Sequence, residues 1–241
     1  MSPMTIHKPP FSWSFSKLRN YESCPLKYKV VDIDKLHVEH SQELDRGEQL
    51  HAAMYQRVAN GTKLPIPYAY MERWATRLTT DLHPEQEIYC ELKLALDRSH
   101  NPTEFMGKRV WCRARIDYLR IIPNQAHVVD YKTGKPRMDD TQLALCAAMV
   151  FHHYPELSQV RTEYIWTEYG DTSHRIYQRS ELPRIWRELL PRVTQLEEAH
   201  DHEDFPAVPN GLCAKYCPVS TCEHWGKRFR REPGTSALVS Y

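Results

Sequence analysis

Two aspartates and a lysine lie close together in residues 113–135, RARIDYLRIIPNQAHVVDYKTGK. The stretch is typical of two short strands joined by a turn at PNQ, where proline and asparagine favour a change of direction. Asp130 and Lys132 are two positions apart at the end of the second strand, so both point to one face. Asp117 can reach that face from the first strand. Two carboxylates and an amine at a strand end are able to hold a divalent cation beside a water molecule, although an ordinary ion pair also explains these residues.

A histidine on the helix that precedes these strands is a further candidate ligand. Apolar residues recur every four positions from Leu50 to Val58, and Gly61 is a natural C-cap, which predicts a helix over residues 43–61. His51 follows Leu50, on or beside the apolar face of this helix. A core histidine and a metal ligand both fit that position, and the acids downstream decide between them.

The other early elements are predicted from periodicity and from their ends. Ser16 is expected to cap an N-terminal helix that stops near the Cys-Pro pair at residues 24–25. A second amphipathic helix is expected over residues 68–82, and an alternating strand, EIYCELKLALD, follows it. Glu91 falls on the face of that strand opposite the apolar row, where reaching the metal site and a solvated or capping role are both open.

The helix after the hairpin, TQLALCAAMVFHHY, is apolar nearly all round and is therefore expected to be buried. Asp140 or Thr141 can cap it. Gln142 is the polar residue of its first turn, and its amide is either aimed at the site or an ordinary surface group. Two further strands, VRTEYIWTEY and HRIYQRS, and a helix over residues 181–200 complete the predicted elements.

Three cysteines fall within ten residues of the tail, in the sequence CAKYCPVSTC. Core packing explains this spacing poorly, so metal or iron–sulfur ligation by Cys213, Cys217 and Cys222 is the favoured interpretation. Such sites normally take four ligands. Cys24 is the best candidate for the fourth, because the remaining cysteines fall in predicted strands or in the buried helix. His224 is the alternative, and it would favour zinc.

Composition restricts the class of protein. The 241 residues are 41% hydrophobic, enough for one large domain or two small ones. A mean hydropathy of −0.65 and the lack of a long apolar run argue against a membrane protein. Basic and acidic residues number 32 and 31, so DNA contact must rest on local patches such as residues 227–231, KRFRR. The first residues lack the apolar core of a signal peptide, so we expect a cytoplasmic location, where disulfide bonds are rare.

The motifs SFSKLRNYESCP, GEQLH, RIDYL, VVDYKTGK and QLAL, followed by the tail cysteines, resemble in this order the PD-(D/E)XK nuclease superfamily. Within it they are most similar to the RecB-like branch and its phage-type exonucleases, over nearly the whole chain. The resemblance implies an α/β, restriction-endonuclease-like core: a central mixed β-sheet flanked by helices, with the N- and C-terminal segments joined by a metal cluster. It implies one domain over residues 1–241, comprising a flexible arm (1–11), cluster-bearing segments (12–35 and 205–226) and a catalytic core (86–170).

The resemblance also implies roles for individual residues. Lys132 would orient or deprotonate an attacking water, and Gln142 would help to position the site or the DNA. A Mg²⁺ or Mn²⁺ ion would be held by His51, Asp117, Asp130 and the backbone carbonyl of Tyr131. A 4Fe-4S cluster, with Zn²⁺ as the alternative, would be held by Cys24, Cys213, Cys217 and Cys222.

These roles predict a metal-dependent deoxyribonuclease, expected to be an exonuclease, that acts in DNA recombination, repair or phage DNA processing in a bacterial or phage-infected cell. A helicase, a recombinase or a single-strand annealing protein would be its candidate partners. Two other classes stay open: a non-catalytic DNA-binding or assembly module with the nuclease fold, and a zinc-stabilised interaction protein. The presence of Asp117, Asp130 and Lys132 together favours the enzyme.

Overall fold

The computed structural model describes residues 11–36, 42–80, 83–231 and 238–240. The chain divides into two compact units, one of Met1–Ser12 with Ser41–Leu189 and one of Trp13–His40 with Leu190–Tyr241. All of the predicted flexible arm except its last residue lies outside the described residues. The assignment of the whole chain to a single nuclease domain stays a prediction.

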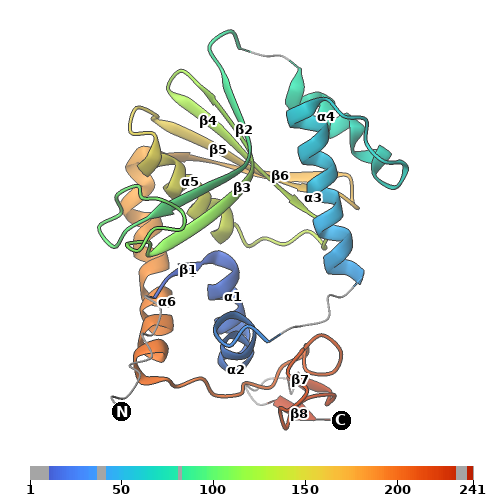
Figure 1. The fold of residues 1–241 in the computed structure, drawn as a ribbon, viewed down its shortest axis with the longest axis vertical. Helices are drawn as coiled ribbons and strands as arrows, with labels where there is room; N and C mark the ends of the chain where they lie inside the picture. Colours follow the sequence, from blue (N-terminus) through green and yellow to red (C-terminus); the bar gives the residue numbers. More distant parts are fainter. Residues whose placement is uncertain (1–10, 37–41, 81–82, 232–237, 241) are drawn as a thin grey trace, which may run out of the picture. The chain divides into compact units, whose positions relative to one another are not determined.

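A mixed β-sheet forms the centre of the first unit (Figure 1). Its order is β2-β3-β4-β5-β6, in which β4 and β5 are parallel and the other neighbours are antiparallel. The sheet and its flanking helices confirm the predicted α/β fold. The strands are β2 (Glu87–Leu96), β3 (Cys112–Ile122), β4 (Gln125–Lys132), β5 (Gln159–Trp166) and β6 (Asp171–Gln178).

The predicted hairpin is formed by β3 and β4. Asn124 takes a φ of +67° in the turn, a conformation that asparagine tolerates better than most residues. The pairing starts at Ile122 with Gln125 and fixes which side chains of β4 face each side of the sheet. Val129 packs towards one face, whereas Asp130 points to the other.

The connection from β4 to β5 is the helix α5 (Thr141–His153), as expected for a parallel pair of strands. Leu143 of α5 packs on Tyr164 and Trp166 of β5. Asp140 is the N-cap residue, but its carboxylate accepts hydrogen bonds from Arg175 and Tyr177. The helix therefore covers one face of the sheet and begins close to the end of β4.

Helices α3 (Gln42–Asn60) and α4 (Glu72–Thr79) cover the opposite face (Figure 1). Gly61 follows α3 with a φ of +69°, which confirms the predicted C-cap. The helix predicted over residues 68–82 is confirmed as α4 over Glu72–Thr79, whereas its first four residues are not α-helical. A 3-10 helix, η2 (Ile66–Met71), precedes α4, since prolines at 65 and 67 favour a tight i→i+3 turn at its start. The predicted C-terminal end, Leu82, lies outside the described residues.

The second unit combines the N-terminal helices with the C-terminal part of α6 (Leu182–His202), which belongs to the first unit up to Leu189. Tyr28 is buried there, and its hydroxyl lies 2.6 Å from His200 Nε2. Ser14, rather than the predicted Ser16, caps the first helix by accepting a hydrogen bond from the Lys17 N–H. The remaining elements are β1 (Trp13–Ser14), α1 (Phe15–Ser23), α2 (Pro25–Tyr28), the π-helix η1 (Lys29–Ile33), the 3-10 helix η3 (Arg179–Glu181), β7 (Phe229–Arg231) and β8 (Leu238–Ser240).

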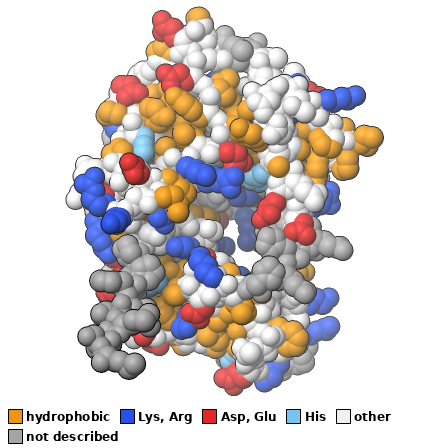
Figure 2. Space-filling view, viewed as in Figure 1, with side chains coloured by type: hydrophobic (Ala, Val, Ile, Leu, Met, Phe, Trp, Pro, Cys, Tyr) orange, Lys and Arg blue, Asp and Glu red, His pale blue; other side chains and the backbone are white. Residues whose placement is uncertain are grey.

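The surface has no single sign of charge on the face shown in Figure 2. Lys and Arg side chains occur there in separate groups, with acidic and hydrophobic side chains between them. This agrees with the near balance of basic and acidic residues in the sequence. None of the helices in the described ranges combines the length and apolar character that crossing a membrane requires.

A buried carboxylate ties α4 to the sheet. Glu163 of β5 is 1% exposed and accepts hydrogen bonds from Arg77 of α4 at 2.9 Å and from His127 of β4 at 3.0 Å. Burial by itself raises the pKa of Glu163, but the hydrogen bonds from His127 and Arg77 outweigh it and lower the pKa to about 2. Glu163 therefore stays ionised and holds two strands and a helix together.

We expect Glu163→Gln to destabilise the fold by about 3 kcal/mol at pH 7, because the ordinary pKa of 4.5 is shifted to about 2 in the folded state. Because the pKa of Glu163 is lower in the folded protein than in the unfolded chain, its ionised carboxylate stabilises the fold fully above pH 4.5. This stabilisation is lost as the pH falls towards 2, the pKa in the folded protein. The difference between variant and wild type should therefore be about 1 kcal/mol smaller at pH 4. Urea unfolding at both pH values measures this, with Glu156→Gln, an exposed position, as the control. Equal unfolding midpoints for Glu163→Gln and wild type would contradict the argument.

Candidate active site

The site lies where β3 stops pairing with β4. The last residue pair of the hairpin is Tyr118 with Val129. Beyond it, the next backbone group of β4 that points towards β3 is the N–H of buried Tyr131. This N–H donates to Asp117 Oδ2 at 2.9 Å. A buried N–H without a partner costs on the order of 1–3 kcal/mol, so the aspartate replaces the missing backbone partner. The separation of the two strands thus fixes one oxygen of Asp117, and the other oxygen faces His51.

His51 approaches the same place from α3. Its Nδ1 lies 3.2 Å from Asp117 Oδ1, and its Nε2 lies 3.1 Å from the backbone carbonyl oxygen of Tyr131. Burial lowers the pKa of His51, but the hydrogen bond and charge of Asp117 outweigh burial and raise it overall. The imidazole therefore touches two of the oxygen atoms that were predicted as metal ligands.

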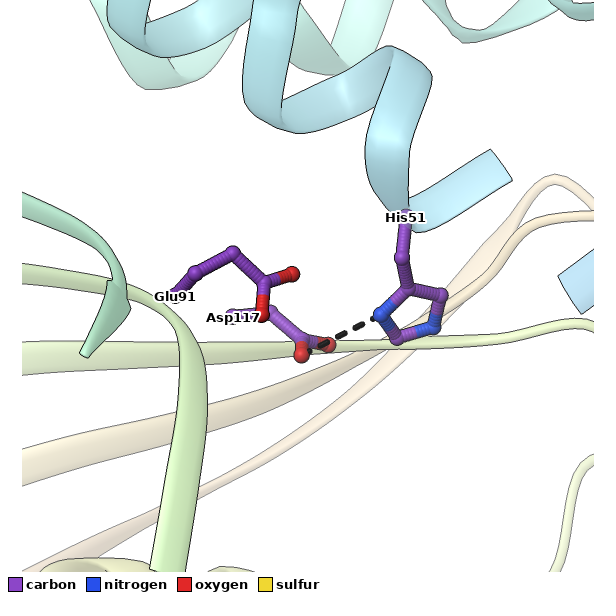
Figure 3. Close-up of side chains that lie close together, drawn as sticks. All are labelled: His51, Glu91 and Asp117. Atoms are coloured by element: carbon purple, nitrogen blue, oxygen red, sulfur yellow. Dashed lines mark ion pairs between the residues drawn. The ribbon is translucent and has the colours of Figure 1, made fainter. Parts of the chain in front are cut away.

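Glu91 completes a group of three donors. His51, Glu91 and Asp117 each offer a ligand atom, and these atoms lie within 4.8 Å of one another. Figure 3 shows His51 hanging from its helix, with the carboxylates of Glu91 and Asp117 coming from the strands beneath it. The sequence left the role of Glu91 open, and it was not among the predicted ligands.

A local distortion of β2 brings Glu91 into this group. Cys90 pairs with Tyr118 and Leu92 pairs with Ile116, but Glu91 between them has a φ of +55°. Positive φ is uncommon for residues other than glycine and costs on the order of 1–3 kcal/mol, so such strain often marks a functional position. Alternation along the strand was the one sequence signal for Glu91, because it set this side chain apart from the apolar row.

Asp130 lies beside this group and is engaged by two partners. Lys132 Nζ is 2.6 Å from Asp130 Oδ2, and Gln142 Nε2 of α5 donates to Asp130 Oδ1 at 2.6 Å. Among the described residues Asp130 is not a member of the three-donor group. The structure thus places all of the predicted side chains of the cation site close together. Gln142 is hydrogen-bonded to the Asp130 carboxylate.

Burial dominates the electrostatics of this pair. It raises the pKa of Asp130 to about 6, opposed by the charge of Lys132 and reinforced by that of Asp117. Burial also acts to lower the pKa of Lys132, but the carboxylate of Asp130 reverses this and raises it. Lys132 Nζ also lies 5.4 Å from the centre of the Tyr164 ring, a cation–π contact. Lys132 is therefore a protonated amine held in a fixed place at neutral pH.

The donor set fits a hard divalent cation. Two carboxylates with an adjacent backbone carbonyl supply the oxygen ligands that Mg²⁺ prefers, and one imidazole suits Mn²⁺ as well. None of these donors is a thiolate, which soft metals would favour. The residues that would hold such an ion are His51, Glu91 and Asp117, with Asp130 and the Tyr131 carbonyl beside them.

The four predicted cluster cysteines converge in the second unit. One small cavity is lined by residues that include Cys24, Cys213, Cys217, Cys222 and His224. Burial raises the pKa of Cys217, and the neighbouring thiols raise it further. Backbone N–H groups donate to three of the sulfur atoms, those of Cys24, Cys213 and Cys222. The other three cysteines lie in β2, β3 and α5, as predicted.

Fold and site together define a class: an α/β protein with a candidate cation site where the strands of a mixed sheet diverge. The model of the PD-(D/E)XK nuclease superfamily matches residues 12–222, and the chain belongs to this superfamily. None of the curated proteins compared with the chain matches it.

One solved structure shows the same fold. The crystal structure of a Eubacterium rectale protein, named as a putative exonuclease, matches with a TM-score of 0.50 and 13% identity, over 98% of this chain and 97% of that chain. At this identity the likeness shows the fold alone. The crystal structure of SSO0001 matches with a TM-score of 0.42 and 16% identity, over 91% of this chain and 90% of that chain.

We expect Mn²⁺ to bind wild-type protein and to raise its melting temperature, and Asp117→Asn to remove most of that effect. Because the pKa of Asp130 is about 6 and that of His51 is raised, acidification protonates donors, so affinity should fall at least about tenfold from pH 7.5 to pH 5.5. Calorimetric titration at both pH values measures this. Glu104→Gln, an exposed acid outside the site, serves as the control. Unchanged Mn²⁺ affinity in Asp117→Asn would contradict the assignment.

Proposed function

We propose that this chain is a Mg²⁺- or Mn²⁺-dependent deoxyribonuclease, and specifically an exonuclease, that hydrolyses phosphodiester bonds in DNA. The observation that supports this best is the fixed Asp130–Lys132 pair beside the donors His51, Glu91 and Asp117. The superfamily of the chain agrees with a nuclease. A non-catalytic module would not need a buried carboxylate that holds a protonated lysine at the edge of a cation site.

The chemistry divides between an ion and the protein. A bound divalent cation supplies positive charge to the phosphate and lowers the pKa of a water molecule. The chain contributes carboxylates that hold the ion and an ammonium group that stabilises negative charge as it develops. Asp130 keeps Lys132 protonated, so Lys132 acts by orienting the attacking water and stabilising charge, rather than as a base.

Gln142 has a positioning role in this scheme. Its amide donates to the Asp130 oxygen that does not face Lys132. This contact fixes the carboxylate plane, and the carboxylate in turn fixes the amine. The start of α5 therefore sets the position of the Lys132 amine through two short contacts, so Gln142 acts on the site through Asp130.

We also propose that the four converging cysteines hold a 4Fe-4S cluster. A single zinc ion would bring its thiolates to about 3.8 Å from one another, given Zn–S bonds of about 2.3 Å. No three donor atoms of these cysteines and His224 lie within 4.8 Å of one another in the described residues. An iron–sulfur cluster separates its thiolates more widely because each binds a different iron atom. The N–H groups on the sulfurs suit thiolate ligands of either group.

The biological setting follows from the chemistry. An exonuclease of this type would act on DNA ends in recombination, repair or phage DNA processing, in the cytoplasm, alongside a helicase, a recombinase or a single-strand annealing protein. The RecB-like, phage-type branch is the part of the superfamily in which we place the chain, on the order of its motifs and the cysteine set.

The cleavage prediction uses linear DNA labelled at one end and circular DNA of the same sequence. Wild type with Mg²⁺ should release mononucleotides from the linear form and leave the circle intact. Lys132→Ala should lower the rate by roughly 10³-fold, because charge stabilisation at the reacting phosphate is lost. Lys108→Ala, in the loop between β2 and β3, should cleave like wild type. Full activity of folded Lys132→Ala, or cleavage without a divalent metal, would contradict the proposed nuclease mechanism. Cleavage of the circular DNA would contradict the assignment as an exonuclease.

The cluster prediction concerns colour and metal content. Anaerobically purified wild type should be brown, with iron and acid-labile sulfide in equal amounts. Cys213→Ser and Cys24→Ser should lose both, whereas Cys90→Ser, at a thiol outside the cavity, should keep them. A colourless wild-type protein that contains one zinc per chain and no iron would show that zinc is the correct alternative.

A further inference from the structure

An open groove of about 590 Å³ lies beside the Asp130–Lys132 end of the sheet, and no role has yet been assigned to it. It is formed by the turn between β5 and β6, the start of α3, and the helices η2 and α4. Its volume is in the range of sites that hold a small molecule or a single nucleotide. The residues used below are Arg46, Tyr70, Arg73, Glu168, Tyr169 and Gly170.

The groove is fixed to the strand that carries the candidate catalytic lysine. Thr167, which is 2% exposed, donates its backbone N–H to the Lys132 carbonyl at 2.9 Å and its hydroxyl to the same oxygen at 3.2 Å. The β5–β6 turn thus begins one hydrogen bond away from Lys132. A ligand in the groove would therefore contact the turn that is hydrogen-bonded to the backbone of Lys132.

Two tyrosine rings border the groove and are not needed to fill the core. Tyr70 of η2 is 41% exposed, and Tyr169 in the turn is 51% exposed. Neither hydroxyl has a hydrogen-bond partner among the described residues. Exposed aromatic faces bind unpaired bases by stacking, typically with little preference for sequence.

Two arginines supply positive charge at the same groove. Arg73 Nη2 donates to the Gly170 carbonyl at 2.8 Å, and its guanidinium lies over the Trp74 ring at 4.5 Å. A Cβ at Gly170 would lie 2.3 Å from Arg73 Nη2, and the φ of +63° also favours glycine. Arg46 pairs with Glu168 at 3.2 Å across the rim. Both guanidinium groups keep unused N–H donors, because each has five.

We infer that this groove binds an unpaired nucleotide of the substrate strand, with its base stacked on Tyr169 and Tyr70 and its phosphate at Arg46 and Arg73. The inference rests on the proposed nuclease function and names its substrate as a single-stranded or frayed DNA end. A base inside a duplex has both faces covered by neighbouring bases and cannot stack on these rings. A double-stranded end would therefore have to open before it enters.

The test compares two fluorescent oligonucleotides of equal length, oligothymidylate and an abasic strand that has the same phosphates but no bases. Binding is measured by anisotropy with Ca²⁺ in place of Mg²⁺. Wild type should bind oligothymidylate roughly tenfold more tightly than the abasic strand. Tyr70→Ala with Tyr169→Ala should lose most of that preference, and the matched pair Tyr70→Phe with Tyr169→Phe should keep it.

The arginines should behave differently from the tyrosines. Arg46→Ala should weaken the binding of both strands by a similar factor and reduce the slope of log affinity against log salt by about one, since it removes a phosphate contact. Arg109→Ala, in a separate surface groove of the loop between β2 and β3, is the matched control and should change neither strand's affinity. Equal loss in both arginine variants would contradict a specific role for Arg46.

Cleavage of the same oligothymidylate separates this inference from the nuclease proposal. The alanine pair should raise KM at least about tenfold and leave kcat within a factor of two. If wild type cleaves DNA but does not prefer oligothymidylate over the abasic strand, the inference is overturned and the nuclease stands. If wild type shows the preference but no metal-dependent cleavage, the nucleotide site stands and the nuclease proposal fails.

Discussion

The site depends on one constraint: the backbone N–H and carbonyl of buried Tyr131 need hydrogen-bond partners, because β3 no longer pairs with β4 at this residue. Asp117 accepts the N–H and His51 meets the carbonyl, so two backbone groups fix the donors that would hold a cation. β5 continues to pair with β4 as far as Lys132, and this keeps β4 straight while its other side is open. The strand β4 therefore stays in the sheet on one side and borders the candidate cation site on the other.

Elements from both faces of the sheet meet at this opening. His51 comes from α3 on one face, and Gln142 comes from α5 on the other and holds Asp130. The parallel step from β4 to β5 requires a crossing helix, and that helix starts where β4 ends. The topology of the sheet thus places an amide at the Asp130 carboxylate, and the same strand end anchors the Thr167 turn.

Local signals in the sequence predicted most of the fold and much of the candidate site. The Asn124 turn, the Gly61 cap and the apolar α5 helix were recognisable because each depends on a few neighbouring residues. The positive φ of Glu91 and the end of β3–β4 pairing were not, since they depend on how three strands meet. The 3-10 helix η2 was missed because its prolines precede residue 68, where the predicted amphipathic helix began. Spacing grouped the three tail cysteines, and the exclusion of the other cysteines left Cys24 as the best candidate for a fourth ligand; all four line one cavity together with His224, the alternative.

The central claim is that the divergence of β3 from β4 creates a cation site with Asp117 at its centre. Anomalous diffraction from crystals soaked in Mn²⁺ tests it most directly. The account predicts a peak at ligand distance, roughly 2.1 Å, from Asp117 Oδ1, with oxygen or nitrogen donors from Glu91 or His51 around it. A peak at another place on the protein, with His51 still bridging Asp117 and the Tyr131 carbonyl, would contradict it.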